Sequence, residues 1–130
     1  MKAKPKKARK RKRKYRAVTE AELLDAILAR RFATDDAGNV FSVNGSPRQL
    51  RVFHDPQKRP CVILYLGGGR RCTTLGRAVW MMANRQLVPE GFAVDHVNRD
   101  KTDNRPENLQ LLEFSENSRQ NQHWAEEDEF

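Results

Sequence analysis

The sequence predicts a small α+β fold, on the basis of three residue patterns. Short apolar stretches separated by turn residues predict a small antiparallel strand meander, with strands at Val40–Val43, Gln49–Phe53, Pro60–Leu66 and Arg70–Thr74. Two stretches with apolar residues at helical spacing predict helices before and after this meander. The last third of the chain reads as strand, loop, strand and helix. A length of 130 residues allows one domain with a modest core.

Both predicted helices have a recognisable start. The first is expected to begin at Thr19, because Thr19-Glu20-Ala21-Glu22 is a capping-box sequence. The second is expected over residues 75–85, with Thr74 as its N-cap and one apolar face. The apolar stripe of the first helix comprises Leu23, Leu24, Ile27, Leu28 and Phe32. We expect both helices to pack against the strands.

Basic residues are concentrated at the N-terminus. Residues 1–16 hold eleven of the 25 Lys and Arg and no acid, whereas residues 17–130 carry fourteen bases against seventeen acids. Such a segment repels itself and buries nothing, so we expect a disordered basic arm over residues 1–16. A cationic arm on a nearly neutral body favours docking onto phosphates, here through Lys10, Arg11, Lys12 and Arg13. A nuclear import signal or a ribosomal-protein arm has the same composition.

Other classes of protein and site are disfavoured. The chain has no apolar run that could span a membrane and no apolar N-terminal segment typical of a secretory signal, which predicts a cytoplasmic protein. A hairpin centred on Gly67-Gly68-Gly69 would place Cys72 opposite Leu64 rather than Cys61, so we expect no disulfide. The two cysteines lack CxxC spacing, so we expect no structural zinc.

The stretch VDHVNRDKTDNRPENL, residues 94–109, contains the residue types that phosphodiester hydrolysis needs. Asp95 offers a hard oxygen suited to Mg²⁺, and neutral His96 can accept a proton from water. Neighbours on a strand point to opposite faces, so both reach one site only if the strand ends there. Asn108 could bridge loop backbone and brace the imidazole, although residues 103–108 could equally be a turn cluster that closes a hairpin.

A second metal ligand is expected from the final helix, which is predicted from Ser115 to about Trp124. Asn117 falls in its first turn, where free backbone N–H groups also favour a phosphate. His123 lies about 120° away from Asn117 around the helix axis and is expected to point elsewhere. The candidates on this helix are Glu116, Asn117, Asn121 and His123.

The segment PEGFAVDHVNRDKTDNRPENLQLLEFSENSRQN, residues 89–121, resembles the HNH endonucleases, particularly small phage and homing-type members. The resemblance lies in the DH pair, the DKTDNRPENL loop and the SEN start of the helix, in their usual order. It implies a C-terminal ββα-metal motif in which His96 is the general base, Asp95 a metal ligand and Asn108 the central Asn. Asn117 stands where the last His of the motif often stands. This amide favours Mg²⁺, or else Mn²⁺, over softer metals.

The resemblance implies a metal-dependent DNA endonuclease that cuts one or both strands with a single divalent ion. Residues 17–86 are then a DNA-contacting scaffold, residues 87–125 the nuclease motif and residues 126–130 an acidic tail. Double-stranded DNA is the expected partner in a bacterial host cell, with phage packaging proteins as further candidates. Besides the arm, the residues expected to contact DNA are Arg99, Lys101, Arg105, Arg119, Arg70 and Arg71. The alternatives are a non-catalytic nucleic-acid-binding protein on this scaffold, in a packaging or regulatory role, and a ribosome-associated protein.

Overall fold

The computed structural model describes residues 15–115. In chain order, the elements are β1 (Arg16–Ala17), α1 (Glu20–Leu28), β2 (Phe32–Thr34), β3 (Val40–Asn44), β4 (Ser46–Gln49), β5 (Phe53–His54), β6 (Pro60–Leu66), β7 (Gly69–Thr74), α2 (Leu75–Asn84), β8 (Phe92–His96), the 3₁₀ turn η1 (Pro106–Asn108) and β9 (Leu109–Glu113). Residues 114–115 are helical, and the rest of the predicted final helix lies outside the described residues. The helix begins at Phe114, one residue before its predicted start at Ser115.

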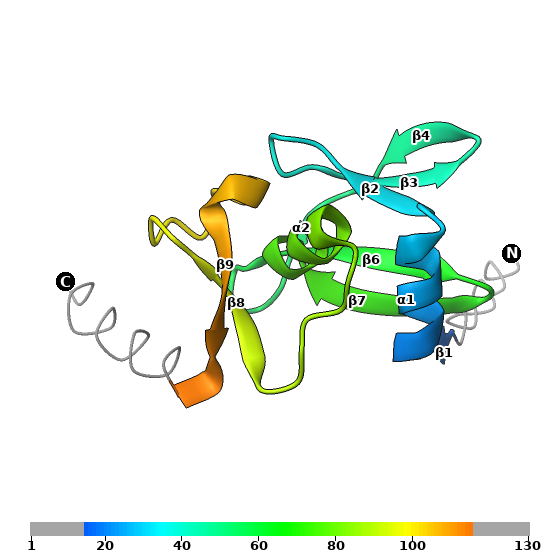
Figure 1. Cartoon of the computed structure of the whole chain (residues 1–130). Helices are drawn as coiled ribbons and strands as arrows, with labels where there is room; N and C mark the ends of the chain where they lie inside the picture. Colours follow the sequence, from blue (N-terminus) through cyan, green and yellow to red (C-terminus); the bar gives the residue numbers. More distant parts are fainter. Residues whose placement is uncertain (1–14, 116–130) are drawn as a thin grey trace, which may run out of the picture.

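Helix α2 lies in the middle of the molecule, and three sheets surround it (Figure 1). The largest sheet has the strand order β1-β7-β6-β5, the second β2-β3-β4, and the third is the β8-β9 pair. Ala78, Val79 and Met81 of α2 are almost completely buried among core residues of all three sheets. Because α2 has neighbours on every side, Trp80 and Met81 also pack in the core. The predicted mixture of helices and antiparallel strands is therefore confirmed.

The strands predicted as one meander belong to two separate sheets. The expected strand Gln49–Phe53 is divided between β4, which pairs with β3, and β5, which pairs with β6. Between them the chain passes from one sheet to the other, and the Leu50 amide donates to the Val40 carbonyl at 2.8 Å. β1 was not expected, and it pairs in parallel with β7 through Arg16. Arg16 therefore lies in the sheet, although the sequence placed it in the basic arm.

Helix α1 begins as expected, and its buried face is narrower than the sequence stripe. Thr19 and Glu22 form the predicted capping box. Arg16 donates two hydrogen bonds to the Glu22 carboxylate, at 2.7 and 2.8 Å, and these lower the pKa of Glu22 to about 2. Leu23 and Ile27 are buried, whereas Leu28 is 56% exposed. The helix ends at Leu28, so Phe32 enters the core from β2 instead.

The β6–β7 hairpin is shifted by one residue from the predicted pairing. Its turn consists of Gly67 and Gly68, which both have positive φ, and Gly69 belongs to the strand. A two-residue turn of this kind suits the twist of a hairpin and favours glycine at both positions. Cys72 therefore lies opposite Ile63 rather than Leu64. Cys61 is buried, Cys72 is exposed, and both are free thiols.

No helix within residues 15–115 has the length and apolarity to cross a membrane.

We predict that Leu23→Ala lowers the free energy of unfolding by about 2–5 kcal/mol, because the substitution leaves a cavity at a fully buried position. The matched control is Leu28→Ala on the same helix, where an exposed side chain is truncated and the cost should be about 0.5 kcal/mol or less. Urea denaturation of the two variants checks this, and equal losses would contradict the assignment of the buried face.

Candidate functional site

The β8–β9 hairpin presents one face to the core. Its antiparallel register pairs Val94 with Leu111 and His96 with Leu109. Leu109 is buried, and Phe92, Val94 and Leu111 pack against the core that contains α2. His96 lies on this same face, at the last position of β8. The alternating pattern of the strand thus places His96 beside α2.

Asp95 lies on the opposite face of β8, as expected for a neighbour on a strand. It is 5% exposed, and its Oδ2 accepts a hydrogen bond from Gln110 Nε2 at 3.2 Å. β8 ends at His96, as the sequence condition for a shared site required. The Val97 amide still donates to the Asn108 carbonyl at 2.8 Å, so the hairpin closes directly after His96.

The environment of Asp95 fits a metal ligand. Within residues 15–115, its carboxylate has a single hydrogen bond, from Gln110. A buried charged oxygen without a partner is costly, and a hard cation is one group that satisfies it. No cluster of three or more His, Cys, Asp or Glu occurs in the described part of the chain. The second expected ligand, Asn117, lies outside the described residues.

The imidazole of His96 is held by Asn104. His96 Nε2 lies 2.7 Å from Asn104 Oδ1. The Asn104 side-chain NH₂ faces the Lys101 carbonyl at 3.4 Å, which leaves Oδ1 as the atom directed at the ring. An amide oxygen only accepts, so Nε2 must carry the proton, and in the neutral ring Nδ1 then holds the lone pair. Asn104 is 5% exposed and His96 is half-buried, so this hydrogen bond is partly shielded from water.

Helix α2 lies directly behind the His96–Asn104 pair. A Cβ atom at Gly76, in the first turn of α2, would lie 3.0 Å from Asn104 Oδ1 and 3.5 Å from His96 Nε2. A residue with a side chain would therefore crowd both groups. Gly76 allows the backbone of α2 to approach the imidazole and the amide at once.

Asn108 organises the loop rather than the imidazole. Its Oδ1 accepts from the Asn98 amide at 3.0 Å, and its Nδ2 donates to Asn98 Oδ1 at 2.9 Å and to the Asp103 carbonyl at 2.8 Å. The expected bridging of loop backbone is therefore present. In the described structure, the contact to His96 comes from Asn104, which corrects that part of the prediction. Asn108 is 5% exposed and satisfies three loop atoms.

The charged residues of the loop pair with one another. Arg105 donates to both carboxylate oxygens of Asp103, at 2.8 and 2.9 Å, and to Glu107 at 2.6 Å. The hydrogen bonds from Arg105 hold the pKa of Asp103 well below its ordinary range. Thr102 donates to Asp100 and lowers the pKa of that carboxyl group too. The loop is therefore held by its own polar groups, and Arg105 already has two anionic partners.

The other residues expected to contact DNA lie in two regions. Arg99 and Lys101 are exposed on the motif loop. Arg70 lies 5.3 Å from the centre of the Tyr15 ring, and Tyr15 packs edge-on against Tyr65. Arg71 donates to the Val18 carbonyl at 3.4 Å and approaches Glu20 at 4.0 Å. The remaining residues, Arg119, Lys10, Arg11, Lys12 and Arg13, lie outside the described residues.

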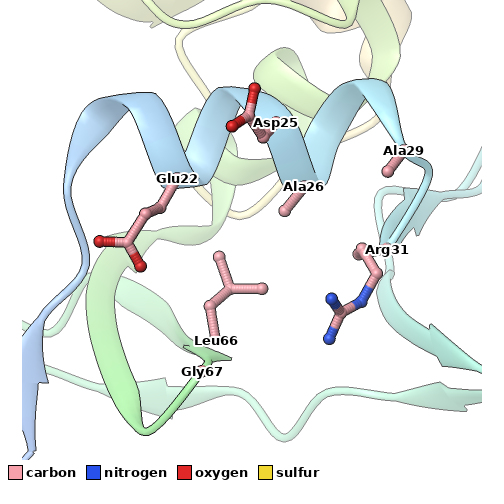
Figure 2. A pocket seen from close by; sticks show the side chains of 7 residues that line it. All are labelled: Glu22, Asp25, Ala26, Ala29, Arg31, Leu66 and Gly67. Carbon is pink, nitrogen blue, oxygen red and sulfur yellow. The ribbon is translucent and has the colours of Figure 1, made fainter.

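A pocket lies between α1 and the turn of the β6–β7 hairpin, away from the β8–β9 hairpin (Figures 1 and 2). One of its two acidic side chains, Glu22, is paired with Arg16. Its lining comprises Glu22, Asp25, Ala26, Ala29, Arg31, Leu66 and Gly67. The pocket contains none of the residues singled out for chemistry, so the motif at the end of β8 is the candidate site.

Comparison with known families identifies this motif. Residues 75–119 match the family model described as HNH endonuclease. Over these residues, about a third of the chain, the protein is similar to HNH endonucleases. The HNH segment begins with α2 and extends past β9. The predicted resemblance is therefore confirmed, and the helix next to His96 belongs to the same unit.

Among solved structures, the fold is similar to that of the HNH homing endonuclease I-HmuI, whose structure is described for DNA binding and cleavage. The TM-score is 0.57 at 20% sequence identity, and the match covers 73% of this chain and 53% of the other. The likeness extends the shared fold beyond the HNH segment, and the chain spans about half the length of that protein. A search of curated proteins found no significant match.

Sequence reasoning missed two residues of this HNH site. Asn104 stands among typical turn residues, and turn composition gives no sign that one amide is buried beside the imidazole. Gly76 stands inside a helical pattern, and a glycine there is a weak signal of close backbone approach. Both contacts depend on where α2 lies, which local sequence does not specify.

We predict that Asn108→Ala lowers the free energy of unfolding by about 1–3 kcal/mol, because it leaves buried loop groups without partners. The control is Asn44→Ala, at an exposed position at the end of β3, which should change stability by about 0.5 kcal/mol or less. Urea denaturation measures both. A loss for Asn108→Ala no larger than for the control would show that its hydrogen bonds do not support the loop.

Proposed function

We propose that the protein is a metal-dependent DNA endonuclease that hydrolyses phosphodiester bonds through its HNH segment. The observation that carries this proposal is the placement of His96. It stands at the end of β8, beside the buried Asp95 in sequence, with its Nε2 hydrogen-bonded to the buried Asn104. A core position gains nothing from a histidine held in one orientation, whereas a general base requires it.

His96 is the proposed general base. With Nε2–H donated to Asn104, Nδ1 accepts a proton from the attacking water. Asn104 selects the tautomer, and Gly76 lets α2 limit the movement of the ring. Asn108 acts on His96 indirectly, because it holds the loop that carries Asn104.

Asp95 is the proposed metal ligand of the described site, and Asn117 is the proposed second ligand. The Asp95 carboxylate is buried, and within the described part of the chain only Gln110 donates to it, which suits Mg²⁺ or Mn²⁺. When bound, such an ion supplies positive charge that stabilises the phosphate and the departing 3′ oxygen. Gln110 holds Asp95 Oδ2 and thereby orients the carboxylate.

Double-stranded DNA is the proposed substrate and partner. On the loop, Lys101 and Arg99 are exposed and can reach phosphates at the site. Arg70, with Tyr15 and Tyr65, provides a second contact region on the large sheet. The basic arm, including Lys10 to Arg13, is the proposed source of sequence-independent affinity.

We predict cleavage of plasmid DNA in Mg²⁺ or Mn²⁺ and no cleavage in EDTA. His96→Ala should lower the cleavage rate by about 10²–10⁴-fold, because the base is lost, while the Kd for DNA changes about twofold or less. Gel assays of nicked and linear plasmid measure the rate, and binding is measured in EDTA.

The control for this experiment is His54→Ala, which removes an exposed histidine on β5 and should leave the rate unchanged. If His96→Ala cleaves as fast as the wild type, His96 is not the base. If the wild type binds DNA and does not cleave it with any divalent metal, the protein is a non-catalytic DNA-binding protein on an HNH scaffold.

We also predict that deletion of residues 1–14 weakens DNA binding and reduces its salt dependence. The slope of log K against log salt concentration should fall in magnitude by about 0.9 for each phosphate that the arm neutralises in the wild-type complex. This deletion retains Arg16, so β1 and the Arg16–Glu22 ion pair remain. Fluorescence anisotropy at several salt concentrations measures the slope, and an unchanged slope would show that the arm does not contact DNA.

A further inference from the structure

The turn between β2 and β3 is held tightly by its own residues. The Asp35 carboxylate accepts hydrogen bonds from the amides of Ala37 and Asn39 at 3.0 and 2.9 Å, and from Asn39 Nδ2 at 3.0 Å. The hydrogen bonds from Asn39 lower the pKa of Asp35. The Gly38 amide donates to the Asp35 carbonyl at 3.3 Å, and Gly38 has a φ of +86°. The turn therefore has one well-defined shape.

This turn lies directly against the loop of the HNH segment. Gly38 is buried, and a Cβ atom there would lie 2.3 Å from the Asn104 carbonyl oxygen and 3.0 Å from the Arg105 nitrogen. Figure 1 shows the β2–β3 connection extending from its sheet toward the hairpin that carries the motif. The backbone of the turn thus covers the peptide bond that follows Asn104.

Asn104 consequently has a neighbour on each side. Its backbone meets Gly38, and its side chain accepts the hydrogen bond of His96 at 2.7 Å. Gly76 of α2 lies against the side-chain oxygen of Asn104. A displacement of the Asn104 backbone would carry the amide with it, because little free volume surrounds that residue.

We propose that the Asp35–Asn39 turn is a positioning element for His96. Gly38 sets the position of the Asn104 backbone, and Asn104 sets the orientation and tautomer of the imidazole. The three-stranded sheet, outside the matched HNH segment, thereby contributes to the site. The catalytic consequence rests on the proposed function, whereas the effect on the imidazole does not.

The sequence offers a matched pair of glycines for the test. Gly38 and Gly45 lie in the turns on either side of β3 and have φ values of +86° and +88°. Alanine is strained to a similar degree at both positions because both need the left-handed region. At Gly45 a Cβ atom would meet nothing within 4 Å. The added methyl group therefore meets Asn104 in Gly38→Ala and meets no neighbour in Gly45→Ala.

The first readout is the environment of the His96 ring nitrogens, measured by ¹⁵N NMR on the full metal-free chain and assigned with His96→Ala. We expect Gly38→Ala to shift both ring-nitrogen signals, because its methyl group displaces Asn104 by on the order of 1 Å from ordinary contact distance. Gly45→Ala should reproduce the wild-type signals. Identical His96 signals in both variants and the wild type would overturn the proposal.

The second readout is plasmid cleavage. We expect Gly38→Ala to lower kcat by about tenfold to a hundredfold with the Kd for DNA within about twofold of wild type, because a small misplacement of a catalytic group is costly. Gly45→Ala should keep both values. Equal kcat in the two variants would overturn the catalytic part of the proposal.

A further variant keeps the test decisive if Gly38→Ala does not fold. Asp35→Ala removes the hydrogen bonds that shape the turn and adds no atom at the contact with Asn104. It should shift the His96 signals in the folded protein, and unchanged signals would contradict the proposal. If the wild type cleaves no DNA, the proposed function fails, while the NMR comparison still tests the positioning role.

Discussion

The β8–β9 hairpin has two strands, and a two-stranded hairpin is marginally stable in water unless it packs against another element. Here the supporting element is α2, which meets the face that carries Phe92, Val94 and Leu109. His96 is on that same face, so the contact that stabilises the hairpin also places the imidazole beside Gly76. The rest of the site depends on this packing. Because α2 also contacts the two other sheets, the hairpin is tied to the core of the whole domain.

The loop between β8 and β9 shows how a highly polar segment acquires one shape. Two of its amides, Asn104 and Asn108, are buried, and each makes hydrogen bonds that satisfy other parts of the loop. Buried polar groups are costly when unpaired, so a network with every member satisfied favours a single conformation. The ion pair of Arg105 with Asp103 adds to this at the surface. The Asn108 amide therefore holds the loop in shape, whereas the Asn104 amide contacts the candidate base His96.

The carboxylates of this protein have two kinds of environment, at the surface and in the interior. At the described surface, most carboxylates that have lowered pKa values bind neighbouring Arg, Asn or Thr groups within a turn or a helix start. Exposed ion pairs of this kind each contribute little to stability. Asp95 differs from them because it is buried and, among residues 15–115, has one amide partner. That difference is the physical basis for the proposal that Asp95 binds a cation rather than a structural ion-pair partner.

Local sequence predicted much of the framework. β6 has the expected boundaries, α1 has the predicted capping box, and α2 begins at the expected Leu75. These features depend on side-chain period and on short-range capping and turn preferences, which the sequence displays directly. The order of residues in the DH pair and the loop was also enough to recognise the HNH segment.

Long-range packing decided the remainder. The division of the strands between two sheets, the parallel pairing of β1 and the one-residue shift of Cys72 each depend on partners distant in sequence. The same holds for the contact of Asn104 with His96 and for the approach of Gly38 from a different sheet. By itself, the sequence determined which residues could do the chemistry, because that depends on their functional groups. The tertiary structure decided which residues hold them in place, because a buried hydrogen bond needs both partners brought together by the fold.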